Sequence, residues 1–254
     1  MLLPSVFVLC FGNGTMSNIA NRLIVALDVD TYDDARALVA VLGEHVGWFK
    51  IGPVLFTKEG PRVLELIKQS DARLFLDLKF HDIPNTVQGA VKNAIAMGAD
   101  MMTLHASGGP TMLSAARTAA EQAGRGDVIL VAVTVLTHLS QDEFNATYGS
   151  TRTVQESVVS LARVAKEGRM TGVVASAQEL PAIKQAMGRD FVVVTPGIRL
   201  PDAKADDQTR VVTPEQAVRD GADYLVVGRP IIGAKDPVAA CREVLDRMES
   251  AVAP

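Results

Sequence analysis

Short apolar segments recur along the chain and alternate with segments that carry helix-start signals. Eight of the apolar segments have the length of β-strands, and they span residues 23–29, 47–51, 73–78, 100–104, 128–135, 172–175, 191–195 and 223–227. Most are continuously apolar, a pattern typical of parallel strands that are covered on both faces. The chain is therefore predicted to alternate strand and helix along most of its length.

Residue types that begin helices mark the connections. Thr31-x-x-Asp34 resembles a capping box before residues 35–42, and Pro84 suits the first turn of a helix that runs to about Met97. Further helices are predicted from Ser107-Gly-Gly-Pro110, over 151–167 and 177–187, from Thr213, and from Asp236 to about Met248. Residues 140–150 are predicted to form a polar loop.

The number and spacing of these units predict a single-domain TIM (β/α)8 barrel. Eight strand–helix units in about 235 residues match that fold in count and length. The alternative is a doubly wound open sheet, which usually has fewer strands and a glycine-rich fingerprint after the first strand. Asp28-Val-Asp-Thr31 stands at that position instead, so the barrel is favoured.

The amino-terminal residues 1–11 are almost entirely apolar. The segment is too short to span a bilayer, and it lacks the cationic start of a secretory signal. We interpret residues 1–15 as an extension outside the fold, with Met16 beginning a barrel domain over 16–254. A genuine targeting segment is the alternative.

Composition narrows the class of protein further. The 254 residues are 48% hydrophobic but only 5% aromatic, with a mean hydropathy of +0.19, which predicts a large aliphatic core. The net charge of −4 provides no basic field for nucleic acid, and no membrane span is predicted. Cys10 and Cys241 are too few for a disulfide framework or a zinc cluster, so a reducing cytoplasm is the expected location.

The most informative motif follows the third predicted strand. Asp77 and Lys79 are two residues apart, so on a strand their side chains point to the same side. Asp82 follows three residues later, where the strand should have become a loop. Acid, base and acid are thus predicted to gather at one strand end, where each perturbs the protonation of the others.

Other polar residues end the remaining predicted strands. In a barrel of this type the chemistry takes place at the carboxyl ends of the strands, so these residues are expected to converge. They are Asp28 and Asp30 at the end of the first strand, Lys50 at the end of the second, Thr103 and His105 at the end of the fourth, Thr134 and Thr137 at or beyond the end of the fifth, Thr195 at the end of the seventh, and Gly228 and Arg229 at the end of the eighth. A structural ion-pair network is the alternative explanation.

A phosphate site is predicted after the eighth strand. Gly228 lets a backbone N–H approach a ligand closely, and Pro230 suits a short helix whose free N–H groups favour an anion. The guanidinium of Arg229 adds a positive charge and can donate two parallel hydrogen bonds to a phosphate. Thr195-Pro-Gly-Ile-Arg199 leads into a long polar loop over 200–212, a lid or a disordered insertion, in which Arg199 and Gln208 are candidate ligand contacts.

The histidines are not predicted to bind a metal. His105 and His138 lack companions at metal-ligand spacing, and the charge of Lys79 would repel a cation beside Asp77. We expect structural roles for both, and a peripheral role for His81.

Taken in order, these residues resemble orotidine 5′-phosphate decarboxylase of the bacterial type, over about residues 23–245. The eleven-residue motif at 77–87 is highly specific, whereas the Gly-Arg-Pro element occurs in other phosphate-binding barrels. Residues 1–15 match nothing in the family pattern. The matching segments are Leu27-Asp28, Phe49-Lys50-Ile-Gly52, Asp77-Leu-Lys-Phe-His-Asp-Ile-Pro-Asn-Thr-Val87, Val133-Thr-Val-Leu-Thr137, Thr195-Pro-Gly-Ile-Arg199, Asp207-Gln208 and Val227-Gly-Arg-Pro230.

The resemblance implies conversion of orotidine 5′-phosphate to UMP and carbon dioxide, without a cofactor, in a homodimer. It also implies a role for each matched residue. Lys79 would donate the proton, and Asp77 would lie beside the substrate carboxylate. Asp28 and Lys50 would bind ribose hydroxyls, and Asp82 and Thr86 would reach the partner's site. Thr137 and Gln208 would contact the pyrimidine, while Arg199, Gly228 and Arg229, with Gln208 nearby, would bind the phosphate.

Three other functions stay open at this point. One is a magnesium-dependent sugar-phosphate decarboxylase or aldolase of the same barrel type, which uses Asp-x-Lys-x-x-Asp. A Schiff-base aldolase that uses Lys50 or Lys79 is disfavoured, because a lysine held between aspartates stays charged and is a poor nucleophile. The last is a catalytically silent nucleotide-phosphate binding protein.

Overall fold

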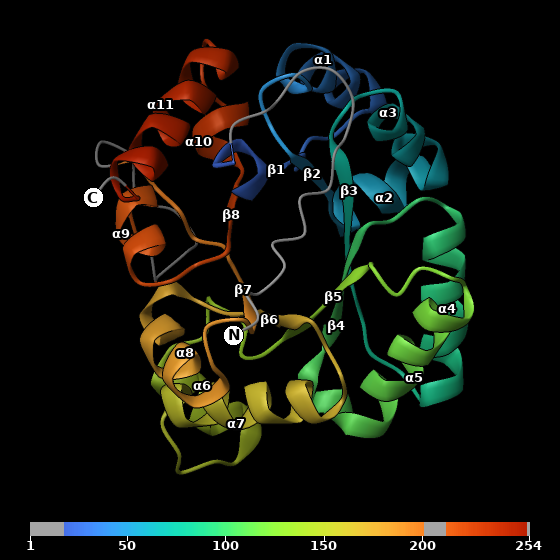
Figure 1. Ribbon diagram of the computed structural model, residues 1–254, viewed down its shortest axis with the longest axis vertical. Helices are drawn as coiled ribbons and strands as arrows, with labels where there is room; N and C mark the ends of the chain where they lie inside the picture. The colour runs from blue at the N-terminus through green and yellow to red at the C-terminus, as the bar shows by residue number, and fades with distance from the viewer. Residues whose placement is uncertain (1–17, 201–211, 253–254) are drawn as a thin grey trace, which may run out of the picture.

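A closed barrel of eight parallel strands forms the centre of the computed structural model, which describes residues 18–200 and 212–252. The strands follow one another around the barrel in chain order, and β1 closes the ring by pairing with β8 (Figure 1). They are β1 (Leu23–Ala26), β2 (Trp48–Ile51), β3 (Arg73–Phe80), β4 (Met101–His105), β5 (Ile129–Val133), β6 (Gly172–Val174), β7 (Val192–Thr195) and β8 (Tyr224–Val227).

The helices form an outer ring around the strands, as Figure 1 shows. The α-helices are α1 (Tyr32–Leu42), α2 (Pro53–Glu59), α3 (Leu64–Lys68), α4 (Pro84–Ala96), α5 (Gly109–Gln122), α6 (Gln141–Tyr148), α7 (Val154–Glu167), α8 (Leu180–Met187), α9 (Pro214–Arg219), α10 (Arg229–Ile232) and α11 (Pro237–Ser250). The short 3₁₀ helices are η1 (Ala20–Arg22), η2 (Gly60–Val63), η3 (Ala106–Gly108) and η4 (Ala177–Glu179).

The predicted barrel is confirmed, and all eight predicted strands are present. The helix starts also agree with the sequence: the side chains of Thr31, Thr213 and Asp236 each accept a hydrogen bond from a backbone N–H of the first turn. Residues 1–17, which include the expected extension 1–15, and residues 201–211 lie outside the described part of the chain.

The prediction of a polar loop over 140–150 is wrong, because most of this segment forms α6. Ser140 and Glu143 form a complete capping box at its start, and Phe144 is buried against the core. Gly149 ends the helix in the left-handed conformation. The helices α2 and α3, which connect β2 to β3, were also not predicted.

The barrel interior is filled by large side chains near the amino ends of the strands. Trp48, at the start of β2, is fully buried and packs edge-on against Tyr224, with ring centroids 5.8 Å apart. Its indole N–H donates to the Asn21 carbonyl over 3.1 Å. Phe75 and Met101 pack in the same inner cluster. These large side chains fill the barrel below its carboxyl end, where the charged residues lie.

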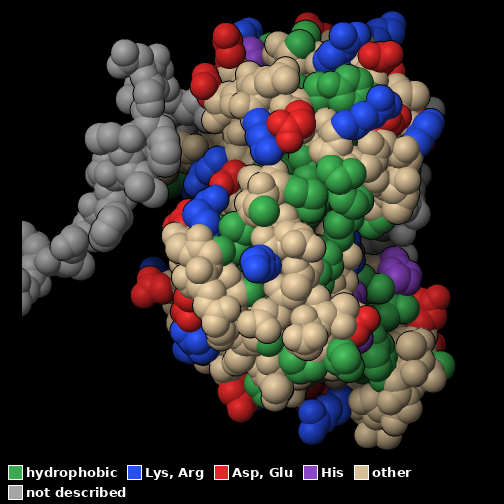
Figure 2. Space-filling view, turned by 90° about the vertical axis from the view of Figure 1, so that its right-hand side faces the viewer, with side chains coloured by type: hydrophobic (Ala, Val, Ile, Leu, Met, Phe, Trp, Pro, Cys, Tyr) green, Lys and Arg blue, Asp and Glu red, His purple; other side chains and the backbone are tan. Residues whose placement is uncertain are grey.

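One face of the helical ring carries charged side chains of both signs, with hydrophobic side chains between them (Figure 2). On the face over α3, α4 and α5, basic and acidic side chains lie next to one another rather than in a patch of one sign (Figure 2). Within the described residues, the longest helices are too short and too polar to cross a lipid bilayer.

Candidate active site

Four charged side chains form a continuous chain of alternating sign at the carboxyl end of the barrel. Lys50, at the end of β2, places its Nζ 3.2 Å from Oδ1 of Asp28 and 3.3 Å from Oδ2 of Asp77. Lys79 contacts the other oxygen of Asp77, with Nζ 2.9 Å from Oδ1. The order Asp28, Lys50, Asp77, Lys79 therefore crosses β1, β2 and β3, as the sequence predicted for these four residues.

Asp77 lies at the centre of this cluster and is 8% exposed. Burial alone disfavours its charged form, but the charges of Lys50 and Lys79 and its hydrogen bonds outweigh that effect, so the pKa of Asp77 is lowered. The hydroxyl of Thr103, on β4, donates to the same carboxylate over 2.8 Å. Asp77 is thus held as an anion by three side chains from three strands.

Lys50 is as buried as Asp77. Burial opposes its charged form, yet Asp77 and Asp28 outweigh the desolvation and the pKa of Lys50 is raised. Lys50 therefore remains an ammonium. The side chain of Lys79 is 33% exposed against 10% for Lys50, so Lys79 is the cation of the cluster that an incoming ligand can reach.

An irregularity in β3 aims Lys79 at the cluster. Leu76 pairs with Met102 and Phe80 with Leu104, so three residues of β3 lie opposite the single residue Thr103. Lys79 itself adopts a positive φ of 52°, a conformation that costs a residue other than glycine about 1–3 kcal/mol. Simple strand alternation was thus an incomplete reason for placing Asp77 and Lys79 together.

Asp82 does not join the cluster within one chain, contrary to the predicted gathering of acid, base and acid. It is exposed, its carboxylate accepts a hydrogen bond from the Ile83 N–H over 2.7 Å, and it forms no ion pair with Lys79 among the described residues. Thr86, in the first turn of α4, is also exposed, and Ile83 is 67% exposed. Asp82 and Thr86 both lie beyond β3, which ends at Phe80, and next to or within α4, which begins at Pro84.

The predicted phosphate residues lie on the β8 side of the same barrel end. Gly228 precedes the short helix α10, and a Cβ built on Gly228 would lie 3.7 Å from Oδ2 of Asp28. Arg229, the first residue of α10, is exposed. Gly228 therefore adjoins the charged cluster through Asp28, and Arg229 is the next residue along the chain.

The loop that follows β7 is anchored at its base. Ile198 and Val212 form an isolated parallel bridge, and the backbone N–H of Arg199 donates to the Val212 carbonyl over 2.9 Å. The Arg199 guanidinium donates to the Ile198 carbonyl over 2.9 Å. Gln208 lies outside the described residues.

The remaining candidates occupy the loops after β4 and β5. Thr137 is half-buried in the turn after β5, and Thr134 donates to the Val174 carbonyl over 3.0 Å. His138 is exposed, while His105 ends β4 beside the His81 ring. In the part of the chain that the structure describes, no three His, Cys, Asp or Glu side chains are grouped so as to hold a metal ion.

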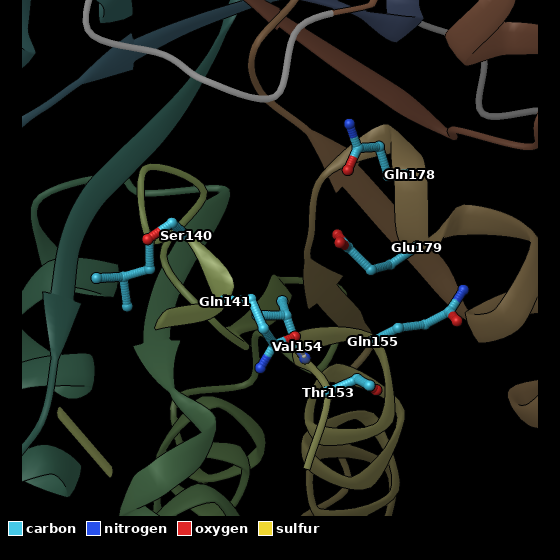
Figure 3. Close-up of a pocket in the computed structure, with 8 residues that line it drawn as sticks. Ser140, Gln141, Thr153, Val154, Gln155, Gln178 and Glu179 are labelled. Atoms are coloured by element: carbon cyan, nitrogen blue, oxygen red, sulfur yellow. Dashed lines mark hydrogen bonds between the residues drawn. The ribbon is translucent and has the colours of Figure 1, made fainter. Parts of the chain in front are cut away.

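A separate pocket of about 470 Å³ lies between the start of α6, the start of α7 and η4. Figure 3 shows Ser140 and Gln141 on one side of it and Gln178 and Glu179 on the other. Much of its polar lining is already bonded within the protein, since Gln141 donates to the Arg152 carbonyl and accepts from the Val154 N–H. None of the residues that line this pocket belongs to the charged cluster.

Sequence reasoning assigned no role to Thr103 beyond its place at a strand end. The structure shows that its hydroxyl donates to Asp77 and accepts from the Lys79 N–H over 2.9 Å. The available signal was that Thr103 is a polar residue within an otherwise apolar segment, one strand away from Asp77.

Replacing Asp77 with Asn should reduce stability in a pH-dependent way. Breaking a buried ion pair costs about 3–5 kcal/mol, so we expect a loss of that order at neutral pH. Because folding lowers the pKa of Asp77, its contribution is present above the unfolded pKa of about 3.9 and is lost as the pH falls through the lower folded value. Urea unfolding of both proteins measures this: the difference should shrink in acid, and a pH-independent difference would contradict the assignment.

The fold and the charged cluster together define a (β/α)8-barrel enzyme with two lysines and two aspartates gathered at the carboxyl end of its strands. Comparison with known proteins identifies the family: the orotidine 5′-phosphate decarboxylase / HUMPS family matches residues 21–244, and the chain belongs to it.

Individual relatives agree with this assignment. An orotidine 5′-phosphate decarboxylase from Syntrophus aciditrophicus is 47% identical over 242 residues, covering 91% of this chain and 96% of the relative. One from Moorella thermoacetica is 44% identical over 233 residues, covering 90% and 92%. The crystal structure of orotidine 5′-phosphate decarboxylase from Lactobacillus acidophilus superposes with a TM-score of 0.78 at 35% identity, covering 89% of this chain and 98% of that one.

Proposed function

We propose that this enzyme decarboxylates orotidine 5′-phosphate to UMP, the final step of UMP synthesis, with Lys79 as its proton donor. The observation that carries the proposal is the alternating array of Asp28, Lys50, Asp77 and Lys79 at the barrel mouth, in a chain whose relatives are named for this reaction. Those names do not favour the magnesium-dependent alternative.

The reaction breaks the bond between ring carbon C6 and the carboxylate carbon. The electron pair of that bond stays on C6, and carbon dioxide leaves. A fixed ammonium at C6 stabilises the developing negative charge and then transfers a proton from Nζ to C6. Lys79 fits this role because it is charged, accessible to a ligand and held 2.9 Å from Asp77; its proton is replaced from solvent after each turnover.

Asp77 has two roles in this scheme. It holds the ammonium of Lys79 in place, and it lies where the substrate carboxylate would be bound, so two negative charges would be brought close together in the ground state. Loss of carbon dioxide relieves that repulsion. Thr103 keeps the Asp77 carboxylate oriented through its hydrogen bond.

The other residues bind parts of the substrate that do not react. Asp28 and Lys50 bind the ribose hydroxyls. Thr137 and Gln208 contact the pyrimidine, while Gly228, Arg229 and Arg199 bind the phosphate together with Gln208. Binding energy from these remote groups is available to position C6 against Lys79.

A direct assay tests the reaction and its independence of metals. Purified protein in excess EDTA should convert orotidine 5′-phosphate with loss of its ultraviolet absorbance and release of one carbon dioxide per UMP. EDTA is expected to change the rate by less than about twofold, because a lysine rather than a metal ion stabilises the carbanion. Activity that EDTA abolishes and Mg²⁺ restores would favour the alternative, and tight UMP binding without turnover would favour a silent binding protein.

A homodimer accounts for the position of Asp82 and Thr86. Both side chains are exposed beside the exposed Ile83, and among the described residues neither forms a hydrogen bond or ion pair with the charged cluster of its own chain. We propose that they reach the site of the partner subunit. The cytoplasmic location stays a prediction from the cysteine content.

Mixing two inactive variants tests the shared site. Lys79→Ala and Asp82→Ala subunits, combined after mild unfolding and refolding, should form heterodimers in which one of the two sites has both residues intact. Random pairing then restores about a quarter of the wild-type activity. Each variant refolded alone is the control, and no recovery in a mixture that demonstrably exchanges subunits would contradict the shared site.

A further inference from the structure

The backbone at Lys79 needs support on both sides of its irregular conformation. On the barrel side, Thr103 accepts the Lys79 N–H and donates to Asp77. Phe80 resumes pairing with Leu104, and the chain then leaves the barrel. Without a contact just beyond Phe80, the positive φ of Lys79 would be free to relax toward a commoner conformation.

That contact is made by two histidine rings. His81 and His105 lie with ring centroids 5.1 Å apart and planes tilted by 33°, within the range of favourable ring pairs. His105 is two residues beyond Thr103 on β4, so both side chains project from the same side of that strand. Two side chains on the same face of β4 therefore contact the segment 77–81: Thr103 contacts Asp77 and Lys79, and His105 contacts His81.

The His81 ring also lies near the end of η3. A Cβ added to Gly108 would lie 3.3 Å from Cδ2 of His81. The exposed His81 ring is therefore placed beside both the end of β4 and the end of η3. The ring pair joins the residue that follows β3 to the neighbouring strand.

We propose that the His81–His105 ring pair is a positioning element that keeps the Lys79 ammonium directed at the reacting carbon. The inference rests on the proposed role of Lys79, since it adds two positioning residues to that reaction. Neither histidine donates a proton to the substrate in this account. They act through the backbone that carries Lys79.

The charge state of the pair follows from its surroundings. Burial, then the nearby His81 and Lys79, lower the pKa of His105, and Asp77 opposes this weakly. Among the described residues, these three groups are the charged or titratable ones that act on His105, and all come from β3 and the residue that follows it. The His105 ring is therefore neutral at neutral pH, and protonation in acid would set like charges together beside Lys79 and loosen the pair.

Three substitutions separate stacking from other roles. His105→Ala removes the ring contact, and kcat should fall by about 10–100-fold, the cost of a displacement of about 1 Å at a reacting group, with little change in KM. His105→Phe keeps a flat ring at this position, so its kcat at neutral pH should stay within about threefold of the wild-type value. Because phenylalanine does not titrate, the kcat of this variant should fall less than the kcat of the wild type when the pH is lowered from about 7.5 to about 5. His45→Ala, in the turn before β2, is the control.

A second pair of variants keeps the test valid if a buried change impairs folding. His81 is exposed, so His81→Ala reports on the same contact from the surface, and it should lower kcat as much as His105→Ala. The double variant should be no worse than either single one, because both remove one contact. Circular dichroism and thermal unfolding confirm that each variant is folded.

The outcomes are distinct. An unchanged kcat in folded His81→Ala and His105→Ala would overturn the inference, as would additive losses in the double variant. If His105→Phe were as impaired as His105→Ala and its KM rose, the ring would be a substrate contact instead. A wild-type enzyme that fails to decarboxylate orotidine 5′-phosphate would refute the proposed function itself, whereas an active wild type with insensitive histidine variants would refute only the positioning role.

Discussion

Lys79→Ala should abolish measurable turnover. The substitution removes both the proton donor, which contributes about 10²–10⁴-fold, and an ammonium next to the developing carbanion, which contributes about 10²–10³-fold more. We therefore expect kcat to fall by at least about 10⁴-fold. Affinity for UMP, measured by calorimetry, should stay within about tenfold, because most of the nucleotide is bound by other residues.

A surface lysine supplies the control. Lys92, on α4, is exposed, so Lys92→Ala should keep wild-type kcat and thereby exclude a general effect of lost positive charge. Appreciable turnover by Lys79→Ala, within about tenfold of wild type, is incompatible with its role as the general acid. A loss of UMP binding as large as the loss of kcat would point instead to collapse of the site around an unpaired Asp77.

Arg229→Ala should cause the second largest loss, confined to substrates that carry a phosphate. A guanidinium that binds phosphate through two charge-assisted hydrogen bonds contributes about 1.5–3 kcal/mol for each bond. Since about 1.4 kcal/mol is a tenfold change in rate, we expect kcat/KM for orotidine 5′-phosphate to fall by about 10²–10⁴-fold. For orotidine, which lacks the phosphate, kcat/KM should change by less than about threefold.

The comparison of the two substrates removes effects of folding. Arg242, exposed on α11, provides a matched control, and Arg242→Ala should leave both substrates unaffected. Equal losses of Arg229→Ala on orotidine and orotidine 5′-phosphate would show that Arg229 supports the structure of the barrel end rather than the phosphate.

The strands were predictable because their burial is continuous. Parallel strands covered on both faces require uninterrupted apolar segments, and each such segment in the sequence became a strand. The predicted positions of the carboxyl ends of the strands were less accurate. Leu27 and Val135 are buried but lie beyond the ends of β1 and β5, because burial in the core continues past the last residues that belong to the strands.

The helix α6 was missed for a different reason. It contributes only Phe144 to the buried residues, so its apolar periodicity is too weak to outweigh its polar composition. Its one clear signal is the local capping box of Ser140 and Glu143.

Within the site, charge and strand order were sufficient to bring four residues together. Asp28, Lys50, Asp77 and Lys79 lie at the carboxyl ends of three adjacent strands of a closed barrel, so topology alone places them at one end. The bulge at Lys79 depends on Thr103, a side chain from another strand, and no local pattern encodes it. Asp82 does not join these four residues within one chain, because it follows the end of β3, and spacing along the sequence does not determine where a residue beyond the strand lies.

The most direct test of the central claim is a crystal structure with bound UMP. The account predicts that Nζ of Lys79 lies within about 3.5 Å of C6 of the pyrimidine, the distance of a reactive contact, with Asp77 on the side that the carboxylate occupied. A complex in which UMP fills the barrel mouth while this nitrogen lies more than about 6 Å from C6, outside hydrogen-bond reach and beyond a single bridging water, would contradict it.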